Sequence, residues 1–151
     1  MFVQADRRGD AAFQLTAAAR RRLNTALELM KSLAQVLAEV ERADLPGAGP
    51  VDSVHSVVST FGETPLHIVS IWGDAEAIEL LVASGAEIDK PGEDAFTPLH
   101  CAAEQDKAPA VGTLLRLGAR NMRNDFGQTP RELAESLNHK RVVALLAAHG
   151  F

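Results

Sequence analysis

The chain of 151 residues contains a single cysteine, so it cannot form a disulfide bond within itself. It also lacks an apolar run of 18 residues that could cross a membrane as a helix. The first residues are charged and do not contain the apolar stretch of a secretory signal peptide. We therefore expect a single domain that has no membrane partner and is located in the cytoplasm.

Sequence patterns that carry catalysis, phosphate binding or metal binding are also missing. There is no glycine-rich phosphate loop and no serine nucleophile elbow. His55, His139 and His149 have no paired ligand three or four residues away and no cysteine companion, so zinc spacing is absent. Glu93 and Asp94 lie on an expected loop tip, where open solvent cannot raise a carboxyl pKa for acid–base catalysis. We expect no enzymatic activity, no cofactor and no metal.

Positive charge is scarce outside the N-terminal part of the chain. Residues 1–31 hold six basic and three acidic side chains, whereas the whole chain has a net charge of −5, so the remainder carries −8. Nucleic-acid binding requires a basic face, and we expect none. The cluster Arg20-Arg21-Arg22 is interpreted as solvated helix surface rather than as a membrane or nucleic-acid contact. An acidic remainder suits a protein partner with a basic surface.

Repetition is the feature that the chain has in abundance. The frame Thr64-Pro65-Leu66-His67 recurs as Thr97-Pro98-Leu99-His100 and, with two changes, as Thr129-Pro130-Arg131-Glu132. A glycine follows each of these threonines by 21 residues, and the three glycines are Gly85, Gly118 and Gly150. A period of 33 and then 32 residues predicts a repeat array, which indicates an architecture that holds another macromolecule.

Each copy predicts two helices joined by a turn. The threonine caps the first helix and the proline occupies its first position, where a missing N–H costs nothing. Apolar residues spaced by three and four predict second helices over about 75–84, 108–117 and 140–148. The three glycines fall where a left-handed C-cap is needed. Asp106 and Asn138 occupy the turn between the helices, and both residue types tolerate left-handed geometry.

These copies resemble the ankyrin repeat, whose pattern Gly-x-Thr-Pro-Leu-His and Gly-Ala-Asp-Val-Asn is matched by residues 62–67 and 85–89. The resemblance covers roughly residues 59–151, with repeats at about 59–91, 92–123 and 124–151. It implies an all-α solenoid of three helix-turn-helix repeats, in which His67 and His100 bridge neighbouring turns by hydrogen bonds. Cys101 is expected to be a buried apolar residue. Arg131 and Glu132 are interpreted as polar substitutions of a terminal repeat.

Residues 1–58 are expected to form a helical cap and a linker that belong to the same folding unit. Residues 10–43 contain neither proline nor glycine and predict an amphipathic helix, either continuous or split near Asn24-Thr25. We expect this helix to cover the first repeat in a monomer through an apolar face made of Leu23, Leu27, Met30, Leu37 and Val40. The alternative is a helix that pairs with a second copy of the chain, which an exposed apolar stripe would favour. Residues 51–58 are compatible with a strand, a short helix or an arm of a hairpin.

The ankyrin resemblance implies a concave binding surface, made by the loop residues before each Thr-Pro pair and by the last residues of each first helix. Carried onto this chain, these positions are Thr60, Phe61, Glu63, Ile71, Trp72, Glu93, Asp94, Phe96, Glu104, Gln105, Asp125, Phe126, Gln128, Ser136 and Leu137. Aromatic side chains surrounded by charge are typical of protein interfaces. For Phe61, Phe96 and Phe126, packing along the loops is an equal alternative.

We therefore expect a protein-binding module that acts by stoichiometric interaction. One alternative is an immunity protein or a specific inhibitor that neutralises a toxin or an enzyme. Another is an oligomeric scaffold that uses the N-terminal helix.

Overall fold

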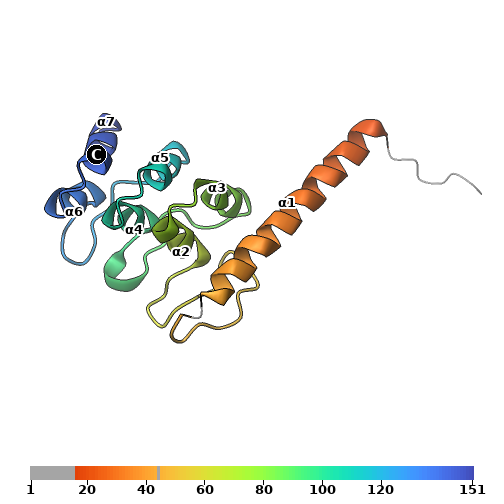
Figure 1. Ribbon diagram of the computed structural model, residues 1–151, viewed down its shortest axis with the longest axis horizontal. Helices are drawn as coiled ribbons and strands as arrows, with labels where there is room; N and C mark the ends of the chain where they lie inside the picture. The colour runs from red at the N-terminus through yellow and green to blue at the C-terminus, as the bar shows by residue number, and fades with distance from the viewer. Residues whose placement is uncertain (1–15, 44) are drawn as a thin grey trace, which may run out of the picture.

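The computed structural model describes residues 16–43 and 45–151, and in this part of the chain every regular element is helical (Figure 1). The elements are α1 (Ala17–Arg42), α2 (Pro65–Trp72), α3 (Ala75–Ala83), the 3-10 turn η1 (Glu93–Ala95), α4 (Pro98–Glu104), α5 (Ala108–Arg116), α6 (Pro130–Ser136) and α7 (Lys140–Ala148). The expected all-α class is confirmed.

The helices after α1 form a solenoid of three helix-turn-helix units. The first helices α2, α4 and α6 contact one another in sequence, and the second helices α3, α5 and α7 form a parallel row behind them. Each first helix also packs on the second helix of its own unit. A continuous apolar core runs through the stack, with fully buried side chains that include Leu66, Leu99, Leu114 and Leu146. Each unit thus buries its neighbour's apolar face, as repeat architectures require.

The helix boundaries follow the signals in the sequence. At the start of α4, the backbone N–H of His100 donates to Thr97 Oγ1 at 3.4 Å. Asp106 and Asn138 adopt φ values of 54° and 62° at the turns between paired helices. Left-handed glycines follow the second helices, and they are Gly85 (φ 99°), Gly118 (φ 97°) and Gly150 (φ 81°). These predicted turn and cap positions are confirmed.

The frame histidines link each repeat to the next. The backbone N–H of Thr64 donates to Nδ1 of His67 at 3.1 Å, so the ring carries its proton on Nε2, which donates to the Phe96 carbonyl at 3.2 Å. His100 repeats the arrangement and bonds the Gln128 carbonyl at 3.0 Å. Burial disfavours the charged ring and lowers the pKa of both histidines. The bridging role that the resemblance implied is confirmed.

Glu132 replaces the histidine in the third repeat and takes over its local hydrogen bond. Its carboxylate accepts the backbone N–H of Thr129 at 2.8 Å and an Arg123 guanidinium N–H at 2.8 Å. The Thr129 N–H, and then Arg123, lower the pKa of this exposed carboxyl. The terminal copy therefore retains a capped helix with a side chain that water can solvate.

Helix α1 is continuous and covers the first repeat with its C-terminal part only. Leu33, Val36, Leu37 and Val40 pack against the core, and α1 contacts both α2 and α3. The predicted contacts of Leu37 and Val40 are confirmed. None of the helices in the described ranges is long and apolar enough to cross a membrane.

The predicted cap contacts of Leu23 and Leu27 are wrong, because these side chains are 51% and 50% exposed. The 26 residues of α1 extend about 39 Å, whereas the 9 residues of α3 extend about 14 Å. The first repeat is therefore too short to reach residues 23–27, and the N-terminal part of α1 projects away from the stack (Figure 1). The side chain of Met30 and residues 10–15 lie outside the described part.

Residues 45–64 form an irregular loop between α1 and α2, without a strand or a helix. Val51, Val54 and Val58 are buried in the common core, and the Val58 N–H donates to the Glu63 carbonyl at 2.8 Å. Of the alternatives left open for residues 51–58, the structure is nearest to an arm that leads into the first repeat. Gly47 has a φ of 76°, and a Cβ added there would lie 2.1 Å from Cγ2 of Thr60.

Candidate protein-binding site

A hollow of 240 Å³ lies where the loops before α2, α4 and α6 meet the first helices. Its lining consists of Glu63, His67, Ile71, Glu93, Asp94, Phe96, Cys101, Glu104 and Phe126. Seven of these nine residues belong to the predicted binding set, namely Glu63, Ile71, Glu93, Asp94, Phe96, Glu104 and Phe126. The structure therefore brings together predicted residues from all three repeats around one depression.

Backbone hydrogen bonds fix the loops that form this hollow. The Gly92 N–H donates to the Phe96 carbonyl at 2.8 Å and closes the second loop, while the Asp125 N–H donates to the Asp94 carbonyl at 2.9 Å and joins the second loop to the third. A Cβ at Gly92 would lie 3.2 Å from Nε2 of His67, so glycine permits this close approach. The site is thus formed before any partner binds, which reduces the entropic cost of association.

The aromatic walls differ in how they are held. The Phe96 ring is half-buried, with its centroid 5.4 Å from that of His100, so Phe96 serves packing as well as lining the hollow. Phe126 is 66% exposed and Phe61 is 54% exposed. Packing within the fold therefore accounts in part for an aromatic side chain at position 96, but it does not account for the exposed rings of Phe61 and Phe126.

Four carboxylates face the hollow without a cationic side chain in its lining. Within the described residues, the ion pairs of the repeats lie elsewhere, for example between Arg120 and Asp89 at 2.7 Å. Glu63 accepts a hydrogen bond from Ser59 Oγ, and Glu104 accepts one from Gln105 at 3.4 Å. The hollow therefore presents concentrated negative charge beside aromatic surface.

The other predicted residues lie outside this lining. Trp72 at the end of α2 and Leu137 after α6 are 43% and 44% exposed. Gln128 is half-buried, and its carbonyl bonds His100, which gives it a structural role. The remaining residues of the set are exposed, and they are Thr60, Phe61, Gln105, Asp125 and Ser136.

The floor of the hollow does not offer a nucleophile. Cys101 is 5% exposed, which confirms the expected burial, and desolvation together with the charges of Glu104 and Glu63 raises its thiol pKa to about 12. A thiol with this pKa is almost entirely protonated near neutral pH and reacts poorly. In the described part of the chain, no group of three or more His, Cys, Asp or Glu side chains is placed to hold a metal.

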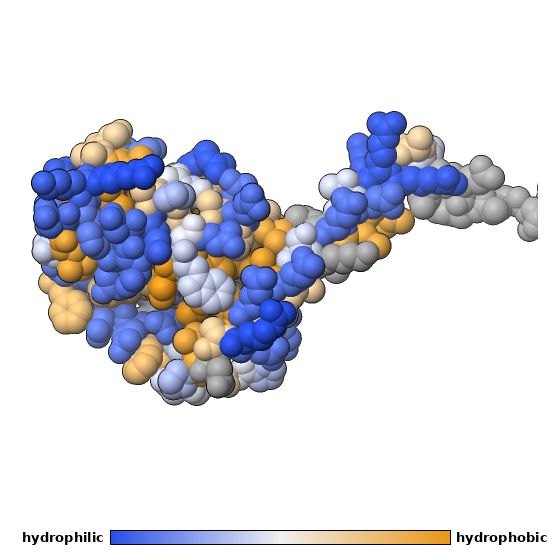
Figure 2. Space-filling view, viewed as in Figure 1, coloured by the Kyte–Doolittle hydropathy of each residue, from blue (hydrophilic) through white to orange (hydrophobic). Residues whose placement is uncertain are grey.

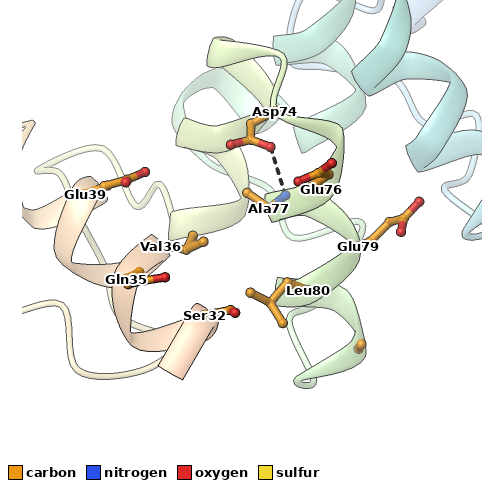
Figure 3. Close-up of a pocket in the computed structure, with 10 residues that line it drawn as sticks. Ser32, Gln35, Val36, Glu39, Asp74, Glu76, Ala77, Glu79 and Leu80 are labelled. Carbon is orange, nitrogen blue, oxygen red and sulfur yellow. Dashed lines mark hydrogen bonds between the residues drawn. The ribbon is translucent and has the colours of Figure 1, made fainter. Parts of the chain in front are cut away.

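A second hollow, of 560 Å³, separates α1 from α3 (Figure 3). Sequence reasoning missed it because its walls come from segments about 40 residues apart. Four carboxylates line it, but two of them have structural partners. Asp74 Oδ1 accepts the Ala77 N–H at 3.0 Å and caps α3, and Glu79 pairs with Arg116. These partners account for two of the four carboxylates, and Glu39 and Glu76 are the other two.

Two relatives from human illustrate what the chain is similar to. Protein phosphatase 1 regulatory subunit 27 is 35% identical over 85 residues, which cover 56% of this chain and 54% of that protein. Cyclin-dependent kinase inhibitor 2A is 34% identical over 92 residues, which cover 60% of this chain and 58% of that protein. The chain thus spans about half the length of the curated relatives that it matches, and their names describe regulatory proteins rather than enzymes.

A family model described as ankyrin repeats, in three copies, matches residues 15–125. This range includes α1 and the loop after it, which precede the region of the repeat motifs, and it ends before α6 and α7. Proteins with ankyrin repeats generally bind other proteins. Together with the two-row helical stack and the histidine bridges, the match shows that the chain belongs to the ankyrin-repeat family.

Proposed function

We propose that the chain is a protein-binding module that associates stoichiometrically with one partner through the concave hollow. The observation that carries this proposal is the convergence of four carboxylates, with no Lys or Arg side chain in the lining, and two phenylalanine rings from three repeats on one preformed depression. The chemistry of this site suits a basic side chain of the partner.

Arginine fits this chemistry best. Its planar guanidinium donates two parallel hydrogen bonds to a carboxylate and also stacks on aromatic faces. Glu63, from the loop before α2, and Glu104, at the end of α4, supply acceptors, while Phe96 and Phe126 supply rings. The volume of 240 Å³ accommodates one long side chain with ordered water, so a single residue of the partner is the anchor.

The test compares two variants with equal changes of charge. The full chain is used to capture its partner by crosslinking and mass spectrometry, and affinity is then measured for each variant with the purified partner. Glu63→Gln/Glu104→Gln should weaken binding at least about tenfold, because a buried cation then loses its acceptors. Glu76→Gln/Glu87→Gln removes the same charge from exposed positions outside the hollow and should leave affinity unchanged. Equal affinity of the first variant and wild type would refute the proposed site.

Salt dependence provides a second test of the basic partner surface. Exposed charges are screened beyond about 8–10 Å at physiological ionic strength, so the association rate should fall as salt is added. An association rate that salt leaves unchanged would contradict the basic surface.

Trp72 tests whether the contact extends beyond the hollow. Trp72→Ala should weaken binding by about 2 kcal/mol, as aromatic anchors often do, and leave the unfolding transition in place because the ring is 43% exposed. Normal binding combined with early unfolding would show that Trp72 serves packing instead.

Inhibition of an enzyme is the second candidate, and the names of the two human relatives favour it. If the captured partner is an enzyme, wild-type chain should inhibit it in a one-to-one titration, and the Glu63→Gln/Glu104→Gln variant should not. If the enzyme keeps its full activity when it is saturated with the wild-type chain, the chain binds it but does not inhibit it. An immunity protein is the narrower form of this candidate, and a toxin domain encoded directly upstream would support it.

A further inference from the structure

Helix α1 has three sides, and two of them face other parts of the same chain. The first packs on the core through residues such as Leu37 and Val40. The second, with Gln35 and Glu39, lines the groove facing α3 (Figure 3). At 100° per residue, a third side lies roughly a third of a turn from each of the others. Its members are Arg20, Leu23, Leu27, Ala34, Ala38 and Glu41.

This third side is a largely exposed stripe with the spacing of a helix-pairing surface. Leu23 and Leu27 are about half exposed, Ala34 is exposed, and Ala38 is half-buried beside the repeats. Steps of three, four and seven residues keep all members on one face, as in two-stranded coiled coils. Figure 2 shows apolar surface on the lower edge of the projecting helix and hydrophilic side chains along its upper edge.

We propose that this stripe pairs with the same stripe of a second copy, in an antiparallel arrangement about a two-fold axis between residues 30 and 31. In this register Leu27 faces the partner copy's residue 34 and Leu23 faces its residue 38, so a large side chain meets an alanine at each of four positions. Arg20 of each copy faces Glu41 of the other, so opposite charges meet at both ends of the helix pair. This pairing is the alternative to the monomer that the sequence led us to expect.

Charge and shape both favour a second copy over an unrelated helix. The stripe carries Arg20 at its N-terminal end and Glu41 at its C-terminal end, while the other charged residues of the last turn are Glu39, which lines the groove facing α3, and Arg42. Antiparallel pairing places Arg20 of each helix opposite Glu41 of the other, whereas a parallel pair would place Arg20 opposite Arg20 and Glu41 opposite Glu41. The repeats then lie at opposite ends of the helix pair, which leaves room for both stacks. None of the residues of the concave hollow takes part, so the two proposals stand independently.

The molar mass of the full chain tests the pairing. Sedimentation equilibrium over a concentration series should give a reversible dimer, and Leu23→Ser/Leu27→Ser should raise the dimer dissociation constant at least about tenfold by removing apolar contact. Leu137→Ser/Val57→Ser removes two comparably exposed apolar side chains elsewhere and should leave the constant unchanged. Circular dichroism should show the same helix content in all three proteins. A wild-type chain that stays monomeric at the highest concentration would overturn the proposal.

A charge exchange tests the register. Arg20→Glu and Glu41→Arg each place like charges together twice in the dimer, so each alone should weaken it several-fold. The combined variant restores opposite charges and should recover most of the wild-type affinity. If the combined variant does not recover, while Leu23→Ser/Leu27→Ser still raises the dimer dissociation constant, the antiparallel register is overturned.

Discussion

The two frame histidines should make the stability of the fold depend on pH in a narrow window. In the native state each Nδ1 accepts a backbone N–H and each Nε2 donates to the carbonyl of the next repeat. A proton added at Nδ1 would break the first of these bonds and place a charge in the core. The native pKa values of His67 and His100 are therefore lowered from 6.5, mainly by burial.

The sign and size of this pH dependence follow from the difference in proton binding between the native and the unfolded chain. The unfolded chain binds these protons near pH 6.5, whereas the native chain binds them only at lower pH. The contribution of the two histidines to the free energy of unfolding is therefore fully present above pH 6.5, and it is lost as the pH falls below this value. On going from pH 7.5 to 5.5, each histidine can remove at most about 1.4 kcal/mol from the free energy of unfolding. The two together set an upper limit of about 2.8 kcal/mol, which is a large share of the stability of a small domain.

Urea denaturation followed by circular dichroism at several pH values measures this loss. The His100→Gln variant should be less stable at pH 7.5 but should lose only about half as much between pH 7.5 and 5.5. Glu132→Gln alters the equivalent position of the third repeat and should leave this window unchanged, because the lowered pKa of that carboxyl places its effect in more acidic solution. A His100→Gln chain with the full wild-type pH dependence would refute the role given to the neutral ring.

Three further predictions concern packing and reactivity. Gly47→Ala should destabilise the fold by about 1–3 kcal/mol in urea denaturation, because φ is positive and a side chain blocks the Cβ, whereas Gly49→Ala meets no atom within 4 Å and should be nearly neutral. Leu37→Ala should cost about 2–4 kcal/mol and Leu23→Ala less than about 0.5 kcal/mol of monomer stability, and equal losses would contradict the exposed stripe. Cys101 should resist alkylation at pH 8 until the chain unfolds, and rapid labelling of the native protein would contradict its raised pKa.

Local signals predicted the repeats because each one acts within a few residues. A threonine cap, a proline at the first helical position and a left-handed glycine determine where α4 begins and where α3 and α5 end. The bridge from His67 to the Phe96 carbonyl spans 29 residues, and it came from the family resemblance rather than from spacing. Features that depend on a few consecutive residues could therefore be predicted from the sequence alone.

The site and the first helix required three-dimensional information. Glu63, Phe96 and Phe126 come from three different repeats, and only the stacking of loops shows that they share one hollow while Trp72 stays outside it. Leu23 and Leu37 have the same helical periodicity, yet only Leu37 meets the core, because the length of α3 limits the surface that α1 can reach. Periodicity indicates that a helix face is apolar, but the partner's dimensions determine how much of it is covered.

The bridges of the two frame histidines run in one direction along the solenoid. Each of the first two repeats holds the loop of its successor, and the third repeat, with Glu132 at this position, makes only a local contact. Release of the third repeat breaks the bonds of Asp125 to the Asp94 carbonyl and of His139 to the Ala103 carbonyl, but it removes no frame histidine that holds an earlier loop, whereas release of α4 frees the loop that carries Phe126. Local opening should begin at the C-terminal repeat, and amide hydrogen exchange there should be the fastest among the three units. A partner seated against Phe126 would then slow exchange in a repeat that it touches through a single ring, which makes the last repeat a reporter of occupancy.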